Sequence, residues 1–405
     1  MKHLIVIPPM DDGCYVTREI GDSIYNRPPY HLNPYNAVVY ATKLRDEDGQ
    51  KVRILDAQAL GLNYEQTKRQ IRKHQPDHVT YFISAYGVPY DVQCVDWSIS
   101  KSFVVSPIKT DVNELIEIYS EFPFEKDDFI TKPNEFIGKA DFSLVDLSRY
   151  SVPIRINTND FCPFQCIFCC RCEMKANLKP VEDTIEEIEY VQERYGINKF
   201  FLFGSEISIN KNLAMQLAEK LLERNITFLT LDRVNLVEED VYDVLYRAGL
   251  RDIHFGVESG SLKILKYMRK NITPEDTVRA FEIVNKFKDV NKRAYFIIGF
   301  PTEGLSDILA SIRLSWKIAP DEPMVEVLYP DVGSPLYKQL KQDKILKTRR
   351  WEFYKHYNRR TLVFKHKRYK NWQSVNVTRY IVMLAMELRN IKQTLAKTTH
   401  FLWRE

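Results

Sequence analysis

Six apolar segments separated by helical stretches run from Pro153 to Pro330, and they constrain the fold of this chain most strongly. The segments are PIRINT, KFFLFG, ITFLTL, DIHFGVE, RAYFIIGF and MVEVLYP, and each has the length and composition of a buried parallel strand. Some intervening helices have clear start signals, such as the cap, proline and early acidic residues of Thr273-Pro274-Glu275-Asp276. The series predicts an α/β core, a partial (β/α)6 version of the TIM-type barrel. Chemistry in such barrels lies at the carboxyl ends of the strands.

A shorter series of strand and helix signals precedes this core. The segments HLIVIPP, KVRILDA and DHVTYFIS are predicted strands, and the weaker SFVVSP is a predicted fourth strand. One predicted helix has Asn33 as its cap, Pro34 at its first position and Gly49 at its end. A second covers NYEQTKRQIRKHQ, and DVNELIEIYSEF is a third candidate. The alternation predicts a Rossmann-like, doubly wound parallel sheet.

The end of the chain differs from the rest in charge. Between Lys338 and Glu405 there are 18 Lys and Arg against 4 Asp and Glu, whereas the remaining residues carry 40 basic and 50 acidic side chains. The strand signals stop near Pro330, so we predict three parts: residues 1–148, 149–330 and a basic, mainly helical extension, 331–405. The extension could bind nucleic acid, and the alternative is a set of solvated helices.

Two further features bear on the environment of the protein. No apolar run approaches the eighteen or so residues that a membrane span requires, and MKHLIVIPPM lacks the cleavage region of a secretory signal. We therefore predict a cytoplasmic protein without a membrane partner. In a reducing compartment, clustered cysteines bind metal or carry out redox chemistry more often than they form disulfides.

Five of the seven cysteines lie in one short stretch, FCPFQCIFCCRC, directly after the first core strand. Cys162, Cys166 and Cys169 follow the spacing CxxxCxxC, which also suits one face of a helix, although Pro163 argues against a helix starting there. A structural zinc site is a second alternative, but zinc ligands usually come in two separated pairs. Three thiolates around a 4Fe–4S cluster explain the stretch better, because they leave one iron open for chemistry. Cys170 and Cys172 receive no ligand assignment.

The spacing CxxxCxxC, with Phe168 just before the last cysteine, resembles the radical SAM superfamily. The resemblance implies a 4Fe–4S cluster held by Cys162, Cys166 and Cys169, whose free iron binds the amino and carboxylate groups of S-adenosylmethionine. It further implies reductive cleavage to methionine and a 5′-deoxyadenosyl radical, which removes a hydrogen atom from the substrate. An electron donor such as a flavodoxin or ferredoxin is implied as a partner.

Later segments resemble the same superfamily at successive strand ends. Gly204-Ser205-Glu206 is similar to its GGE-like segment, which holds the amino group of S-adenosylmethionine, and HFGVESGS is similar to its GxESGS segment. The resemblance implies cofactor-binding positions at Phe168, Gly204, Ser205, Glu206, Arg233, Glu258, Ser259, Ser261 and Gly299. A surface ion pair is the alternative for Arg233, and a plain turn is the alternative for Gly299 in IIGFPTEG.

The order of the parts resembles the radical SAM branch with an N-terminal cobalamin-binding domain, which implies a corrin at the carboxyl edge of the first sheet. The chain departs from that pattern in three places. The third helix is cut short between Ser84 and Phe103, and Val105-Ser106-Pro107 replaces a glycine pair. No Asp-x-His-x-x-Gly segment offers a histidine to cobalt, and His3, His31, His74 and His78 are the only histidines of this part. Cobalamin is therefore an open prediction, with a scaffold role for the domain as the alternative.

These observations predict a radical SAM enzyme, with a cobalamin-dependent methyltransferase or cyclase as the specific form. One alternative is a cobalamin-independent radical SAM enzyme that acts on RNA or another anionic substrate. An alternative of another class is a zinc-stabilised nucleic-acid-binding protein. The sequence does not reveal the substrate, because substrate contacts come from variable loops and extensions.

Overall fold

The structure is a computed structural model. It describes residues 1–9, 15–16, 25–26, 31–84, 88–106, 112–113, 116, 120, 122–130, 136, 138–159, 162–169, 178–331, 333–347 and 363–402. The chain forms two compact units. The first comprises Met1–Pro163, Ile167–Phe201 and Pro330–Phe364, and the second comprises Phe164–Cys166, Leu202–Tyr329 and Lys365–Glu405.

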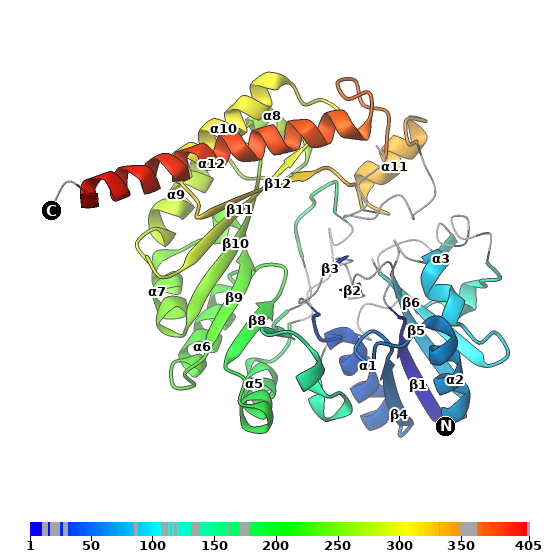
Figure 1. The fold of residues 1–405 in the computed structure, drawn as a ribbon. Helices are drawn as coiled ribbons and strands as arrows, with labels where there is room; N and C mark the ends of the chain where they lie inside the picture. The colour runs from blue at the N-terminus through cyan, green and yellow to red at the C-terminus, as the bar shows by residue number, and fades with distance from the viewer. Residues whose placement is uncertain are drawn as a thin grey trace. The chain divides into compact units, whose positions relative to one another are not determined.

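A parallel four-stranded sheet lies in the N-terminal part of the first unit (Figure 1). Its strands follow the order β4-β1-β5-β6, with bounds β1 Lys2–Ile7, β4 Lys51–Asp56, β5 His78–Ser84 and β6 Ser100–Ser106. The connecting helices are α1 Tyr35–Asp46, α2 Tyr64–His74 and the short α3 Val88–Asp91. Further short elements are β2 Tyr15–Val16, β3 Tyr25–Asn26, η1 Val92–Cys94, η2 Lys126–Asp128, η4 Phe142–Leu144 and η5 Leu147–Arg149. All four predicted strands are present, and the Rossmann-like sheet with its shortened third helix is confirmed. The candidate helix DVNELIEIYSEF falls largely outside the described residues.

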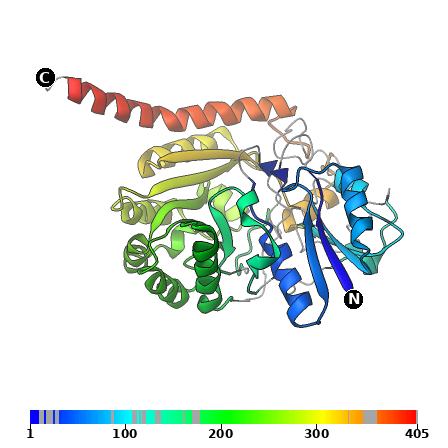
Figure 2. The ribbon, with the colours of Figure 1, turned by 60° about the horizontal axis from the view of Figure 1, so that its bottom comes forward.

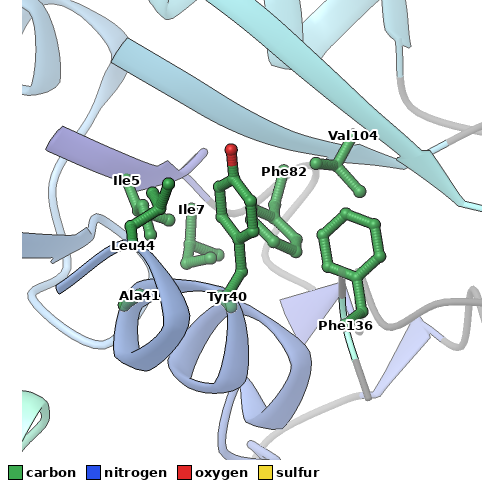
Figure 3. Close-up of a cluster of buried hydrophobic side chains, with 9 residues drawn as sticks. Ile5, Ile7, Tyr40, Ala41, Leu44, Phe82, Val104 and Phe136 are labelled. Atoms are coloured by element: carbon green, nitrogen blue, oxygen red, sulfur yellow. The ribbon is translucent and has the colours of Figure 1, made fainter. Parts of the chain in front are cut away.

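Helix α1 covers one face of this sheet with a cluster of apolar side chains (Figure 3). Alternate residues of a strand point to opposite faces, so Ile5 and Ile7 of β1 face α1 together. The cluster comprises Ile5, Ile7, Ala37, Tyr40, Ala41, Leu44, Phe82, Val104 and Phe136, none of them more than 7% exposed. This packing fixes α1, and with it the segment that precedes α1.

That segment corrects one prediction. Asn33 does not cap α1: the helix begins at Tyr35, and Pro34 occupies its cap position without a side-chain hydrogen bond. The side chain of Asn33 instead pairs with the backbone of Arg155, donating from Nδ2 to the carbonyl at 2.9 Å and accepting from the amide at 2.8 Å. An asparagine amide matches the donor and acceptor of one peptide unit, so Asn33 ties the start of α1 to the first core strand.

Six strands form the core sheet in consecutive order, β12-β11-β10-β9-β8-β7. They are β7 Ile154–Asn157, β8 Lys199–Phe203, β9 Thr227–Asp232, β10 Leu250–Glu258, β11 Asn291–Ile298 and β12 Glu322–Val327. Each predicted segment therefore forms a strand, and the strands β9 to β12 pair with one another in parallel. The helices that accompany them are α5 Val181–Tyr195, α6 Lys211–Leu221, η6 Val234–Leu236, α7 Glu239–Arg247, α8 Leu262–Tyr267, α9 Pro274–Val284 and α10 Leu305–Ile318. The partial (β/α)6 architecture is confirmed.

A buried charged pair stabilises the first unit where α5 meets α1. Lys179 Nζ lies 2.7 Å from Glu187 Oε2, and both side chains are almost completely buried. Tyr35 completes the group, because its hydroxyl accepts from Lys179 at 2.8 Å and donates to Glu187 at 3.0 Å. Removing one partner of such a pair leaves a buried charge uncompensated, at a cost of about 3–5 kcal/mol.

The C-terminal extension contains α11 Pro335–Gln342 and the long α12 Trp372–Leu402. Helix α12 contacts β12 and α10, and its end extends past them (Figures 1 and 2). Arg379 donates from Nη1 to the carbonyl of Val325 at 3.2 Å, and Trp316 donates from Nε1 to the carbonyl of Ala385 at 2.7 Å. Among the described residues, no helix is long and apolar enough to span a membrane.

Candidate functional site

The cysteine loop follows β7, as predicted. Its described residues 162–169 are irregular, with one turn at Ile167 and Phe168, so the amphipathic-helix alternative is wrong. Cys166 is buried, whereas Cys162 and Cys169 are half-buried, and all three thiols are free of disulfides. Cys170 and Cys172 lie outside the described residues. The loop therefore offers three free thiols on a backbone that is not committed to a helix.

Two backbone hydrogen bonds anchor the loop within the first unit. The carbonyl of Phe168 accepts from the amide of Asp331 at 2.9 Å, and the carbonyl of Ile167 accepts from the amide of Leu336 at 2.8 Å. Ser334 caps α11 between these two donors, and Pro335 begins that helix. Asp331 and Leu336, on either side of the Ser334 cap, thus hold the cysteine loop by its backbone.

No group of three His, Cys, Asp or Glu side chains within the described ranges is arranged to hold a single metal ion. The ligands of one zinc ion converge on one point. The thiolates of a 4Fe–4S cluster bind different irons and therefore stand farther apart. The donor set itself, three cysteines in one loop, fits such a cluster.

Arg233 lies against the cysteine loop in the second unit. Its Nη1 is 3.8 Å from the sulfur of Cys166, and its guanidinium stacks on the ring of Phe164 at 3.8 Å from the centroid. Nε donates to Asn235 at 2.7 Å, while Nη2 is buried and has no hydrogen-bond partner. The side chain is only 2% exposed, so Arg233 is not part of a surface ion pair and that alternative is wrong. A buried cation stabilises the thiolate form of a cysteine, which is the form that binds iron.

A buried ion pair stands at the end of β10. Lys270 Nζ lies 2.7 Å from Glu258 Oε1, with 10% and 8% of the two side chains exposed. Burial alone would lower the pKa of Lys270, but the Glu258 carboxylate and the nearby Cys166 sulfur raise it. A Cβ at Gly256 would lie 2.5 Å from Glu258 Oε1 and 2.8 Å from Lys270 Nζ, so a larger residue there would displace the ends of the paired side chains. Glu258 has φ +62°, a strained conformation for a residue with a side chain.

The two serines of the same motif bind α10. Ser261 donates from Oγ to Asp307 at 2.6 Å, and Ser259 Oγ lies 3.3 Å from Ser311 Oγ. Between them, a Cβ on Gly260 would stand 2.3 Å from the carbonyl of Ala310. The structure thus uses Ser259 and Ser261 to pack the end of β10 against α10, and their cofactor-binding role stays a prediction.

The end of β8 and the end of β9 carry acidic side chains. Gly204 and Glu206 are buried and Ser205 is half-buried. Asp232 accepts from Tyr242 Oη at 2.7 Å and from the amide of Arg233, and burial raises its pKa to about 6. Asp232 was not singled out from the sequence, although its position beside Arg233 at a strand end was a usable signal.

Gly299, at the end of β11, has φ +95° and donates from its amide to Glu303 Oε2 at 2.6 Å. The segment from Gly299 to Glu303 is a turn, so the alternative of a plain turn describes its local structure correctly. Glu303 is buried, its Oε1 has no hydrogen-bond partner, and burial raises its pKa to about 7. The sequence reasoning did not select Glu303, because a glutamate in a turn is ordinarily exposed.

We expect Glu303 to make the stability of the apoprotein depend on pH. Its folded-state pKa is about 7 against an ordinary 4.5, so its contribution is fully favourable below about pH 4.5 and is lost as the pH rises through 7. The full effect is about 3 kcal/mol. The groups that act on it are Asp307, Arg368, Lys263 and Tyr369. Denaturant unfolding between pH 5 and pH 8 should show a flatter profile for Glu303→Gln than for the parent. Glu282→Gln, at an exposed position, should leave the profile unchanged; equal slopes for all three proteins would contradict the prediction.

The geometry of the site indicates a class of enzyme. Parallel strands end in buried charged side chains and a loop of free thiols, which is the arrangement of an α/β enzyme that holds a redox cofactor at the carboxyl edge of its sheet. The family model of the radical SAM superfamily matches residues 156–315. Residues 156–315 are therefore a radical SAM domain, which makes the protein an enzyme of the kind that uses a 4Fe–4S cluster and S-adenosylmethionine.

Relatives and solved structures extend the likeness beyond that domain. An uncharacterized methyltransferase of Pyrococcus horikoshii is 26% identical over 408 residues, covering 87% of this chain and 86% of the relative. The radical S-adenosylmethionine methyltransferase TsrM from Kitasatospora setae, solved with cobalamin and a 4Fe–4S cluster bound, has a TM-score of 0.62 at 14% identity, covering 84% of this chain and 78% of TsrM. The cobalamin-dependent S-adenosylmethionine radical enzyme OxsB, solved with aqua-cobalamin and S-adenosylmethionine bound, has a TM-score of 0.62 at 16% identity, covering 85% of this chain and 55% of OxsB.

Proposed function

We propose that the protein is a radical SAM methyltransferase that uses cobalamin together with its cluster. The observation that carries the proposal is the extent of the fold match: the likeness to TsrM and OxsB spans 84% and 85% of this chain. The 160 residues of the radical SAM domain account for less than half of the chain, so the likeness includes much of the remainder. The methyltransferase relative from Pyrococcus covers a similar share and supports the same reaction.

One feature of the second unit suits S-adenosylmethionine. The unpartnered Nη2 of Arg233 is a buried donor beside Cys166, where a carboxylate would satisfy it. We therefore assign Arg233 to the methionine carboxylate. Cys162, Cys166 and Cys169 would hold the cluster, and Phe168, Gly204, Ser205, Glu206, Glu258, Ser259, Ser261 and Gly299 remain proposed cofactor positions. When bound, the cluster would supply the electron for cleavage of S-adenosylmethionine, and cobalamin would carry the methyl group.

The fit to cobalamin depends on the four histidines of residues 1–148. The rings of His3 and His78 meet edge to face at the amino ends of β1 and β5, and His74 ends α2 just before β5. These three lie at the edge opposite to the one where a corrin would bind. The fourth, His31, is buried against the ring of Tyr150. The described residues therefore suit a cobalamin whose cobalt receives no histidine ligand from these four residues.

The carboxyl edge of the same sheet carries a buried polar side chain beside the apolar end of β1. Asp56, the last residue of β4, is buried and accepts from Tyr150 Oη at 2.9 Å and from the amide of Ala59 at 2.9 Å. Pro107, part of the segment that departs from the cobalamin pattern, falls outside the described residues. Polar groups at this edge fit the amide side chains of a corrin better than an apolar edge would.

Anaerobic reconstitution tests the proposal. The protein is loaded with iron and sulfide, incubated with hydroxocobalamin and passed through a gel-filtration column; we expect a coloured complex with about one corrin per chain. Reduced to cobalt(II), the complex should show an electron paramagnetic resonance spectrum without coupling to a histidine nitrogen. Loss of all corrin on the column, with S-adenosylmethionine cleavage intact, would reject cobalamin while leaving the superfamily assignment in place.

We propose the partners of the protein only by their class. The enzyme requires a reductant, and we propose a flavodoxin or ferredoxin as the electron donor. The basic residues of the extension leave RNA as an alternative substrate, and a cytoplasmic location stays a prediction. A filter-binding assay with transfer RNA, compared at low and high salt, tests the nucleic-acid alternative.

A further inference from the structure

One side of α12 carries apolar side chains that face solvent. Val377, Ile381, Leu384 and Leu388 are 56%, 59%, 57% and 53% exposed. Five of the fifteen large apolar side chains that are exposed in the described parts of the chain fall between residues 377 and 388. Surface apolar residues normally occur singly, so this concentration on one helix requires an explanation.

The same helix is already anchored by its other side. Val375, Val382 and Met386 are at most 2% exposed, and α12 contacts β12 and α10. The exposed residues are therefore a second apolar stripe, separate from the one that attaches α12 to its own unit. Packing against β12 and α10 does not account for it.

The spacing of the exposed stripe identifies its geometry. Residues 377, 381, 384 and 388 are four, three and four apart, and the sequence continues the alternation at Ile391, Leu395, Thr398 and Leu402. This is a heptad repeat with Ile381, Leu388, Leu395 and Leu402 at a and Val377, Leu384, Ile391 and Thr398 at d. Seven of these eight positions are apolar across almost four heptads, a pattern typical of a coiled coil. We call these eight positions the α12 seam.

A helix with the same period is the natural partner of such a seam, and a second copy of this chain supplies one. The charged residues also favour a second copy as the partner. Glu387 occupies position g, and Lys392 occupies position e of the following heptad. In a parallel pair those two positions face each other, so two attractive contacts form across the dyad. Figures 1 and 2 both show the C-terminal part of α12 extending past β12 and α10 of its own unit.

We propose that the α12 seam forms a parallel coiled coil with the α12 seam of a second copy, so that the protein is a homodimer. The contact is independent of the cofactors and of the proposed reaction. It adds an interaction surface to a part of the chain for which the sequence reasoning considered only solvation or nucleic acid.

Sedimentation velocity and light scattering on the full-length protein test the proposal. We expect a mass of twice 47.8 kDa for the parent and of 47.8 kDa for the double variant Leu384→Glu, Leu388→Glu. Leu222→Glu changes a comparably exposed leucine, 41% against 57% and 53%, outside α12 and should remain dimeric. Circular dichroism and iron content of each variant separate loss of pairing from loss of folding.

Charge exchange tests the parallel orientation. Glu387→Lys and Lys392→Glu should each weaken the dimer, whereas the double exchange should restore it to the parent level. A monomeric parent at micromolar concentration, including one that pairs only with a different protein, would overturn the proposal. So would a double Leu→Glu variant that stays dimeric, because the contact would then lie elsewhere.

Discussion

Replacing Cys162, Cys166 and Cys169 by alanine together is expected to abolish cleavage of S-adenosylmethionine and to remove the iron–sulfur signal of the anaerobic protein. Alanine cannot bind iron, and no described residue of the loop other than these three offers a thiolate. We expect each single replacement to lower the iron content and the cleavage of S-adenosylmethionine as well. The loss should be largest for Cys166→Ala, because Cys166 is buried beside the Arg233 cation. The measurements are iron and sulfide content, the visible absorption spectrum, and formation of 5′-deoxyadenosine and S-adenosylhomocysteine.

Cys94 provides the matched control. Its thiol is buried in the first unit and donates to the carbonyl of Asp91, so Cys94→Ala removes a buried cysteine that lies outside the loop. We expect this variant to load iron like the parent. A triple variant that retained its full iron–sulfur signal would refute the cluster assignment. Zinc bound stoichiometrically by the parent, without iron, would refute it as well.

Patterns that depend on local periodicity predicted the fold well. All six core strands lie where apolar segments were found, and α9 begins after the predicted cap Thr273, which forms a capping box with Asp276. These features arise from backbone geometry within a few residues, so neighbouring sequence determines them. Asn33 shows the limit. Its side chain satisfies a peptide unit 122 residues away, and nothing near Asn33 in the sequence signals that contact.

The sequence predicted which residues lie at the site, but it did not predict which side chains they contact. Arg233 and Glu258 were selected as strand-end residues, and both are buried and charged in the structure. The partner of Glu258 was not foreseen, because Lys270 lies twelve residues further on, after α8 and outside every motif. The close approach of Gly256 to this ion pair was likewise not foreseen, because it is a tertiary property.

The serines illustrate a different limit. Ser259 and Ser261 lie in a segment that resembles a cofactor-binding motif, yet their hydroxyls bind Ser311 and Asp307 of α10. A serine hydroxyl can form a hydrogen bond with a ligand or with a neighbouring helix. Only the position of that helix shows which of these partners is available. Gly260 belongs to the same structural unit, because the carbonyl of Ala310 occupies the space of its missing side chain.

Replacing Arg233 by glutamine is expected to raise the dissociation constant for S-adenosylmethionine by about 100-fold, close to 3 kcal/mol. The guanidinium is buried, stacks on Phe164 and directs an unpartnered Nη2 into the site, so the variant loses a charge-assisted contact that water cannot replace. Arg233→Lys should recover only part of the affinity, about tenfold, because an ammonium group lacks both the planar fork and the stacking surface. Equilibrium binding to the cluster-loaded protein measures both effects.

Arg251→Gln is the control for loss of an arginine that lies over an aromatic ring. Arg251 lies 5.2 Å from the ring centre of Tyr246 at the exposed start of β10, away from the carboxyl edge, so its replacement should leave the affinity for S-adenosylmethionine unchanged. Because Arg233 also lies against Cys166, iron content must be measured in every variant. Arg233→Gln with full iron content and weakened S-adenosylmethionine binding would establish the carboxylate contact. Unchanged binding would show that the buried guanidinium serves the thiolate alone, and loss of iron with each Arg233 variant would assign it chiefly to the stability of the cluster.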